Sequence, residues 1–273
     1  MEDFKDKNVV ITGASRGIGL GIAKKLASSG ANIAVFAKTD LPHPKLPGTI
    51  HTAVEEIKGL GVKSIAVKTD IRFDDQVENA VQKVIHEFGS IDILINNASA
   101  IGLFNSESLP MKQFDLMHDI NLRGTYLCSK ICLPYLKKAS NPHILNMSPP
   151  ISLKAKWFKN FTAYTIAKYG MSMCVIGMSE EYKKYNIAVN ALWPRTAIDT
   201  AAIRMLGGVV SSDQCRSVDI LADAAFFILK RDSKQFSGNF CIDEQILSEE
   251  GVNDLEKYSI KPGTKLFTDL FLD

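Results

Sequence analysis

Two side chains of this 273-residue chain have the types and the spacing that acid–base chemistry requires. Tyr164 and Lys168 stand four residues apart in a segment with helical periodicity, so both project from one face of the predicted helix. A free phenol has a pKa of about 10 and is a poor proton donor or acceptor at pH 7. A neighbouring ammonium lowers that pKa and prepares the phenol for general acid–base catalysis. The same spacing also occurs where a packed tyrosine lies beside a lysine that reaches solvent. The elements around the pair must therefore show whether it is catalytic or only structural.

A glycine-rich segment near the start of the chain predicts a phosphate-binding turn. It reads T-G-A-S-R-G-I-G over residues 12–19, after an apolar β-branched run and before a helical pattern that ends at Gly30. Such a turn lets backbone approach a phosphate, and the helix N-terminus offers free N–H donors. The spacing is not G-x-G-x-x-G, and no Lys-Ser/Thr pair follows, which argues against a P-loop nucleotide hydrolase. The residues expected to bind the cofactor here are Gly13, Ser15, Arg16, Gly17, Ile18 and Gly19.

Strand and helix patterns alternate along the rest of the chain. Strands are predicted at 8–11, 32–37, 64–67, 91–95, 144–147, 188–192 and 239–242, and helices lie between them near 52–60, 74–88, 119–138, 162–184 and 218–229. This alternation predicts an α/β fold: one doubly wound Rossmann-type domain with a parallel sheet and helices on both faces. We expect the domain to span residues 1–250. Residues 251–273 are expected to form a packed extension or the start of a linker.

The composition is that of an ordinary globular protein. The chain is 46% hydrophobic and 23% charged, with a net charge of +2, which suggests neither a nucleic-acid partner nor an acidic membrane surface. No apolar run approaches the roughly 20 residues of a membrane span, and the N-terminus shows no targeting signal. The five cysteines lack companion histidines and are expected to be reduced thiols of an intracellular protein, with no metal site.

The residues after the second strand bear on which dinucleotide binds. NAD-binding enzymes usually place an acid there to hold the ribose 2′-hydroxyl, whereas here Lys38 follows the apolar run. A cation suits a 2′-phosphate, and Arg16 could reach the same group, so NADP is favoured over NAD. Two alternatives stay open: Asp40 binds the ribose, or Lys38 is a solvated surface lysine.

With the glycine loop after the first strand and the tyrosine–lysine pair one helix after the fifth, the chain resembles the short-chain dehydrogenase/reductase family. Its cofactor loop reads T-G-x-x-x-G-x-G, and the resemblance covers residues 7–244. N-N-A-S at 96–99 is close to the family's N-N-A-G, and P-R-T-A-I-D-T at 194–200 stands where the family has P-G-x-x-x-T. Arg195 replaces the glycine of that second motif. The sequence at 236–243 resembles the family's closing T-G-x-x-x-x-V-D strand.

The resemblance implies a role for each matching residue. Asp70 would bond the adenine, Asn97 and Ala98 would line the cofactor, and Lys168 would also hold the nicotinamide ribose beside Tyr164. Asn121 would hold a water that links the lysine to solvent. The remaining implied contacts, to the nicotinamide and the phosphates, come from Pro194, Thr196, Ile198 and Thr200.

The serine that polarises the substrate oxygen is displaced. The family places it about thirteen residues before the tyrosine, whereas Ser148 precedes Tyr164 by sixteen, and Pro149 occupies the usual place. Ser148 is the candidate, with Ser152 or neither serine as alternatives.

The resemblance implies an NADP-dependent oxidoreductase that interconverts a secondary alcohol and a ketone, with hydride transfer and Tyr164 as the acid or base. A catalytically silent NADP-binding or scaffolding protein is the rival. Segments 100–118 and 196–216, which are rich in Met and Leu, are expected to select an apolar, lipid-like substrate. Family habit implies a homodimer or homotetramer. Unusual features at 38–46, 148–150 and 193–198 narrow the resemblance to one subgroup of the family. That subgroup is associated with peroxisomes and mitochondria, which implies one of these locations, and the cytoplasm stays an alternative.

Overall fold

The computed structural model describes residues 3–42, 46–205 and 210–272. Two expectations therefore fall partly outside the described residues: the unusual feature at 38–46, in which 43–45 are not described, and the second substrate-selecting segment at 196–216, in which 206–209 are not described.

One seven-stranded sheet forms the centre of the described chain. Its strand order is β3-β2-β1-β4-β5-β6-β7, and every neighbouring pair is parallel. The strands are β1 (Asn8–Thr12), β2 (Asn32–Ala37), β3 (Ser64–Lys68), β4 (Ile93–Asn96), β5 (His143–Asn146), β6 (Ala188–Trp193) and β7 (Phe240–Ile242). The predicted doubly wound α/β fold is confirmed, and all seven predicted strands are present within one or two residues of their expected bounds.

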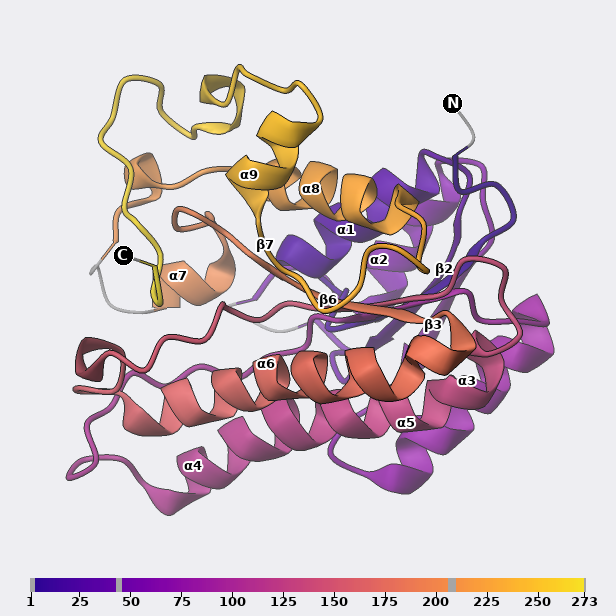
Figure 1. The fold of residues 1–273 in the computed structure, drawn as a ribbon, viewed down its shortest axis with the longest axis horizontal. Helices are drawn as coiled ribbons and strands as arrows, with labels where there is room; N and C mark the ends of the chain where they lie inside the picture. The colour runs from indigo at the N-terminus through magenta and orange to yellow at the C-terminus, as the bar shows by residue number, and fades with distance from the viewer. Residues whose placement is uncertain (1–2, 43–45, 206–209, 273) are drawn as a thin grey trace.

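Helices cover both faces of the sheet (Figure 1). One layer contains α1 (Gly17–Ala27), α2 (Ile50–Lys58), α8 (Asp219–Lys230) and α9 (Asp243–Glu249). The other contains α3 (Asp74–Phe88), α4 (Met111–Met117), α5 (Thr125–Leu136) and α6 (Thr162–Tyr182). A short α7 (Ala201–Met205) lies beyond the end of β6. Because each face is covered, β1 and β6 are buried along their whole length, as in other parallel sheets.

The helical pattern predicted at 119–138 differs most from the structure. Helix begins earlier, at Met111, and residues His118–Gly124 form a π-helical segment before α5 starts. An inserted π turn shifts the apolar face of a helix, so a search for the ordinary helical period loses the pattern there. Helices α7 and α9 were not predicted, because each is short.

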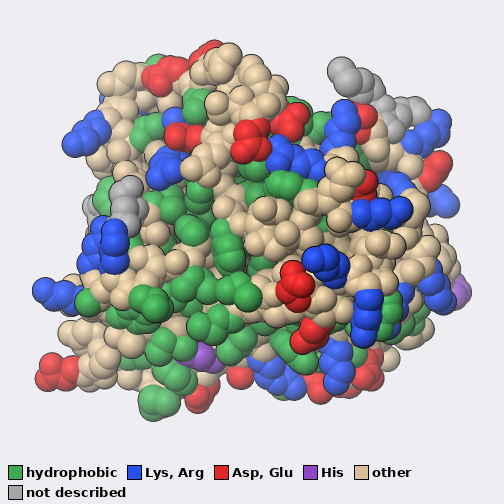
Figure 2. Space-filling view, in the orientation of Figure 1, with side chains coloured by type: hydrophobic (Ala, Val, Ile, Leu, Met, Phe, Trp, Pro, Cys, Tyr) green, Lys and Arg blue, Asp and Glu red, His purple; other side chains and the backbone are tan. Residues whose placement is uncertain are grey.

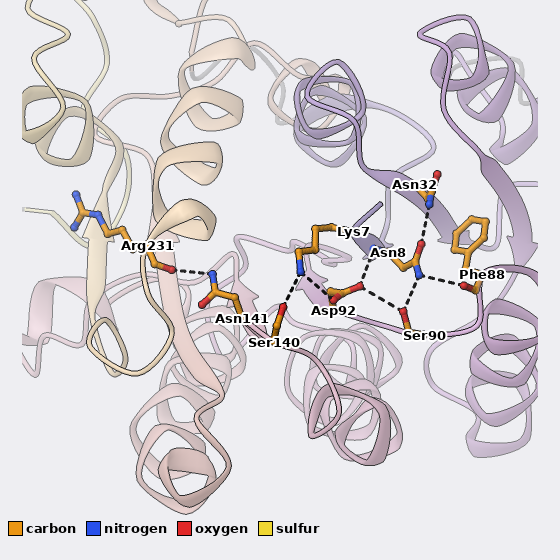
Figure 3. Close-up of polar contacts among 9 residues, drawn as sticks. All are labelled: Lys7, Asn8, Asn32, Phe88, Ser90, Asp92, Ser140, Asn141 and Arg231. Carbon is orange, nitrogen blue, oxygen red and sulfur yellow. Dashed lines mark hydrogen bonds and ion pairs between the residues drawn. The ribbon is translucent and has the colours of Figure 1, made fainter. Parts of the chain in front are cut away.

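The amino-terminal edge of the sheet is tied together by polar side chains (Figure 3). The Asn8 amide nitrogen donates to Ser90 Oγ at 2.8 Å, and its oxygen accepts from Asn32 at 2.9 Å. Asp92 accepts from the Asn8 backbone at 3.0 Å and pairs with Lys7 at 3.6 Å. These contacts join β1 to β2 and to the loop before β4. The ligand site is expected at the opposite ends of the strands, the carboxyl ends.

The strand order reverses between β1 and β4, whose neighbours β2 and β5 lie on opposite sides. In such sheets the crevice outside the carboxyl ends of these two strands is the ligand site. None of the helices in the described ranges is long and apolar enough to cross a membrane.

Candidate active site

A cavity of about 400 Å³ opens at the carboxyl ends of β1 to β4. The predicted cofactor residues that line it are Gly13, Ser15, Arg16, Gly17, Ile18, Lys38, Asp70, Asn97, Ala98 and Thr200. Gly19, Pro194, Thr196 and Ile198 lie outside its lining, as do Tyr164 and Lys168. The structure thus brings the residues expected around the adenosine and phosphates into one cavity and separates them from the catalytic pair.

The glycine loop is shaped for a close approach of backbone to backbone. Gly13 has φ +70°, and a Cβ there would lie 2.8 Å from Ala98 Cα. A Cβ on Gly19 would lie 2.5 Å from Asn97 Nδ2, so Gly19 acts by admitting the Asn97 amide. The helix that follows has no side-chain cap, which leaves its first N–H groups for a ligand. These features fit a dinucleotide phosphate.

Thr12 is a site residue that the sequence analysis did not single out. Its hydroxyl accepts from the backbone N–H groups of Asn97 and Ala98, both at 3.0 Å. The Asn97 side-chain amide in turn donates to two carbonyls at the end of β1, Thr12 O at 3.0 Å and Gly13 O at 3.2 Å. These bonds clamp the ends of β1 and β4 together and fix the floor of the cavity. The T-G pair of the loop was the available signal.

The end of β2 carries a lysine that lines the cavity and an acid that is already paired. Lys38 is exposed and lines the cavity. Asp40 does not line it: its carboxylate contacts His51 at 2.7 Å and Lys68 at 3.2 Å. Hydrogen bonds from these partners, His51 first, lower the pKa of Asp40. Arg16 also has a structural task, because its guanidinium donates to the carbonyls of Pro47 and Gly48, both at 2.7 Å.

Asp70 is held in place by a neighbouring arginine. The Arg72 guanidinium donates to both carboxylate oxygens, at 2.9 Å and 2.6 Å, and this contact lowers the pKa of Asp70. Since a carboxylate has about four acceptor sites, Asp70 keeps capacity for a further donor such as an adenine amino group.

The predicted catalytic pair, Tyr164 and Lys168, lies at the carboxyl ends of β5 and β6, near the start of α6. Tyr164 is 5% exposed and Lys168 is 2% exposed. Lys168 Nζ donates to Met147 O at 2.6 Å and lies 5.0 Å from the centre of the Trp193 ring. Burial lowers the pKa of Lys168 to about 7, although the charge of Asp269 opposes the change.

The expected lowering of the tyrosine pKa is wrong for this arrangement. Burial first, and then the negative charge of Asp269, raise the pKa of Tyr164 well above its usual value. The phenol is therefore neutral here, and the lysine ammonium is turned toward a backbone carbonyl.

A buried polar network fixes α6 on the sheet. The Asn96 amide donates to Asn146 Oδ1 at 2.9 Å and to Ser129 Oγ at 3.1 Å, and the Asn146 amide donates to Met171 O at 3.2 Å. The network joins β4, β5, α5 and α6, so the helix that carries the catalytic pair has one fixed position relative to the cavity.

Asn121 lies in the π-helical segment and is fully buried. Its Oδ1 accepts from Ala100 N at 2.8 Å, and its Nδ2 donates to Ala100 O at 2.9 Å. The amide that was expected to hold a water therefore holds the loop after β4, and the positioning of that loop is its structural role.

Ser148 is fully buried, and its hydroxyl has no partner among the described residues. Pro149 beside it is anchored, because Ser172 Oγ donates to its carbonyl at 2.6 Å. Ser152 is fixed through its backbone, which exchanges two hydrogen bonds with the Tyr169 hydroxyl at 3.0 Å and 3.2 Å. An unpaired buried hydroxyl is costly unless a ligand uses it, so Ser148 stays the candidate.

The C-terminal segment, residues 266–272, runs back over the catalytic pair. Ala197 N donates to Phe267 O at 2.8 Å, and Thr196 forms an antiparallel bridge with Thr268. The Trp193 indole donates to Leu270 O at 2.9 Å. Three of the predicted nicotinamide contacts, Pro194, Thr196 and Ile198, are therefore buried beneath or beside this segment. No motif in the sequence pointed to it.

The family follows from a comparison with known proteins. The model of the short chain dehydrogenase family matches residues 7–206. The chain belongs to this family. It is 60% identical over 265 residues to hydroxysteroid dehydrogenase-like protein 2 of Bos taurus, an alignment that covers 97% of this chain and 63% of that protein. The chain therefore spans less than two thirds of the length of the curated relatives it matches.

Solved structures agree with this family. A dehydrogenase structure from Xanthomonas campestris superposes with a TM-score of 0.96 at 48% identity and covers 99% of both chains. A short chain dehydrogenase from Mycobacterium thermoresistibile gives a TM-score of 0.93 at 47% identity, with 98% of this chain and 96% of that one covered. Both structures carry dehydrogenase names, which agrees with the family of this chain.

Proposed function

We propose that the chain is an NADP-dependent oxidoreductase that interconverts a secondary alcohol and a ketone on an apolar, lipid-like substrate. The observation that carries this proposal is the position of Tyr164 and Lys168, buried at the carboxyl ends of β5 and β6 and one strand along from the cofactor cavity. A bound nicotinamide would supply or accept the hydride. The protein's own residues would move the proton and hold the substrate oxygen.

In the reductive direction, the neutral Tyr164 hydroxyl gives its proton to the substrate oxygen. The phenolate left behind has a high pKa in this buried site, so it needs a positive charge nearby. Lys168 supplies that charge once its ammonium turns from Met147 O toward the phenol and the cofactor ribose. Ser148, whose hydroxyl lacks a partner among the described residues, polarises the substrate oxygen. Asn121 supports the proton relay indirectly, because its amide positions the loop after β4 through Ala100.

The preference for NADP over NAD rests on the charges around the end of β2. Lys38 and Arg16 line the cavity, whereas Asp40 is held by His51 and Lys68 away from it. A ribose 2′-phosphate would meet cations there, and a 2′-hydroxyl would lack an acidic partner from β2.

An apolar substrate is supported by the side chains that surround the catalytic tyrosine. Ile101, Leu103, Leu109 and Phe114 come from the expected substrate segment and pack against the cluster that contains Tyr164. Figure 2 shows hydrophobic side chains gathered on the face that carries the left half of α6 in Figure 1, beside the C-terminal segment. The hydroxysteroid name of the relatives agrees with such a substrate.

We also propose that the chain forms a homodimer or homotetramer through α5 and α6. Tyr126 on α5 is 55% exposed, and Met173 on α6 is 59% exposed. Ile166 and Ile176 are also large exposed apolar residues of α6. Action in peroxisomes or mitochondria remains a proposal that rests on the resemblance alone.

Tyr164→Phe tests the proposal directly. The substitution removes one hydroxyl and keeps the ring, so we expect NADPH to bind with unchanged affinity while kcat for ketone reduction falls by about 10²–10⁴-fold. Loss of NADPH absorbance over a panel of ketones gives kcat, and fluorescence titration gives the Kd of NADPH. Unchanged turnover would remove Tyr164 from the mechanism. A wild type that binds NADPH but turns over no ketone, acyl or sterol substrate would favour the silent scaffolding alternative.

A further inference from the structure

The C-terminal segment, residues 266–272, closes the substrate side of the catalytic pair. Phe271 is 2% exposed and lies at the centre of an aromatic cage. The cage rings and their centroid distances to Phe271 are Tyr169 at 5.3 Å, Trp193 at 5.8 Å, Trp157 at 6.0 Å, Tyr164 at 6.1 Å and Phe161 at 6.4 Å. One of these rings is the catalytic tyrosine itself. Phe271 therefore packs against the ring of the residue that is proposed to exchange the proton.

The backbone at Phe271 is held in an unfavourable conformation. Its φ is +71°, and the other described non-glycine residues with positive φ are Asp6, Asn160 and Asn186. Asp and Asn tolerate this region, whereas a bulky aromatic side chain rarely adopts it. The packing of the ring in the cage must offset this strain. Once the ring leaves the cage, the backbone relaxes, so the open position is not far above the closed one.

The attachment of the segment also suits movement at its end. Residues 267 and 268 are fixed by Ala197 N–Phe267 O and by the Thr196–Thr268 bridge. Beyond them, the Asp269 backbone donates to Arg195 O at 3.1 Å and Leu270 O accepts from Trp193 at 2.9 Å. The last four described residues are therefore held by these two hydrogen bonds, by the caged Phe271 ring and by the packing of Leu270 and Leu272 on the same cluster.

We propose that Asp269–Leu272 is an internal plug, in which the Phe271 ring occupies the place of the substrate's apolar group and must be displaced by it. The inference rests on the proposed function insofar as Tyr164 is the reacting group. It adds the substrate feature that opens the site: a planar or ring-containing apolar group next to the carbonyl, able to replace Phe271 among five aromatic rings.

The chain contains its own reporter for the plug. It has two tryptophans, and both Trp157 and Trp193 contact Phe271, while the Trp193 indole also bonds Leu270. Displacement of the plug exchanges these ring contacts for contacts with the ligand and breaks the Trp193–Leu270 bond, so it changes the tryptophan emission.

The experiment compares the wild type with Phe271→Gly, which removes the ring and tolerates the positive φ. The probe is 4-phenyl-2-butanone, a ketone that carries a phenyl ring, and 2-butanone is the control that lacks it. If the plug is open in about one wild-type molecule in ten, its removal lowers the Kd of the probe by about tenfold, because the apparent Kd rises with the inverse of the open fraction. Calorimetry gives the Kd, and we expect no such change for 2-butanone. Wild-type emission should change on adding the probe, because the bond from the Trp193 indole to Leu270 O breaks.

Two further variants keep the result interpretable. Phe271→Leu retains apolar volume without the ring and should give a smaller tightening. Lys265→Ala changes an exposed residue that precedes the plug and leaves the cage filled, so its Kd for the probe should match that of the wild type. NADPH binding reports correct folding, because no residue of 266–272 lines the cofactor cavity.

The alternative is that Phe271 is a permanent wall of the substrate site. In that case Phe271→Gly weakens probe binding, and the wild-type emission stays unchanged when the probe binds, and either result overturns the plug. Failure of the proposed function would look different: no variant would oxidise NADPH with any ketone, while the tryptophan and calorimetric signals would still report the plug.

Discussion

The buried Lys168 ammonium permits a test that separates the stability of the fold from its chemistry. Lys168 is 2% exposed, and its pKa falls from 10.5 to about 7 in the folded chain. Each pKa unit corresponds to about 1.4 kcal/mol, so at pH 7 the burial of this group disfavours the folded state by about 4 kcal/mol. Lys168→Met removes that penalty at similar volume.

Part of this gain in the free energy of unfolding is lost again, because the substitution also removes favourable contacts. The variant gives up the 2.6 Å bond to Met147 O and the contact with the Trp193 ring, and Asp269 loses a neighbouring positive charge. Together, the loss of these contacts destabilises the folded variant by about 2 kcal/mol. We therefore expect a net stabilisation of about 2 kcal/mol at pH 7, or a rise in Tm of about 4–8 °C for a chain of this size. Ketone reduction should be abolished.

The pH dependence gives the sharper criterion. Since the pKa of Lys168 is lower in the folded state, the penalty is fully present below about pH 7 and fades as the pH rises toward 10.5. At pH 9 about 2 kcal/mol of it remains, and the side chain of the folded protein is then neutral, so the variant loses only the bond to Met147 O, about 1 kcal/mol. Urea unfolding at pH 7, 8 and 9 should show a stability gain that becomes smaller as the pH rises. Lys130→Met, at an exposed position on α5, is the control and should change stability little at any of these pH values. A less stable Lys168→Met variant at pH 7, or a gain that does not vary with pH, would refute the reasoning.

Two substitutions in the cofactor cavity complete the set. Gly19→Ala drives a Cβ to within 2.5 Å of Asn97 Nδ2, so we expect about 2 kcal/mol of destabilisation and weaker NADPH binding, measured by urea unfolding and fluorescence titration. Its control is Gly177→Ala on α6, where a Cβ has no neighbour within 4 Å and should be neutral or stabilising; equal effects of the two would contradict the close-approach argument. Lys38→Ala should raise the Kd of NADPH about tenfold and leave that of NADH unchanged, because only NADPH carries the 2′-phosphate. An equal loss of affinity for NADPH and NADH would show that Lys38 does not bind that phosphate.

The parts of the fold that depend on local pattern could be predicted from the sequence. The apolar run before Gly13 and the helical period after Ile18 placed the first strand, the turn and the helix, and the same reasoning located all seven strands. Ten of the predicted cofactor residues line one cavity, because residues that follow parallel strands must meet at one edge of the sheet.

What the sequence analysis missed depends on long-range contact. The approach of Phe271 to Tyr164 joins residues more than a hundred positions apart, and no periodicity marks a single aromatic ring that returns to the site. The choice between Lys38 and Asp40 at the end of β2 needed the positions of His51 and Lys68, which hold the acid. The pKa of Tyr164 depends on burial and on Asp269, which a four-residue spacing cannot reveal.

The polar ties around Asn8 and Asp92 have a consequence for how enzymes of this architecture diversify. They fix the strands at their amino-terminal ends, away from the candidate site, so the register of β1, β2 and β4 does not depend on the loops at the carboxyl ends. Insertions and substitutions in those loops can therefore alter which substrate is accepted without disturbing the strands. In this chain the last residues of the described segment share in that freedom, because they shape the site from outside the sheet altogether.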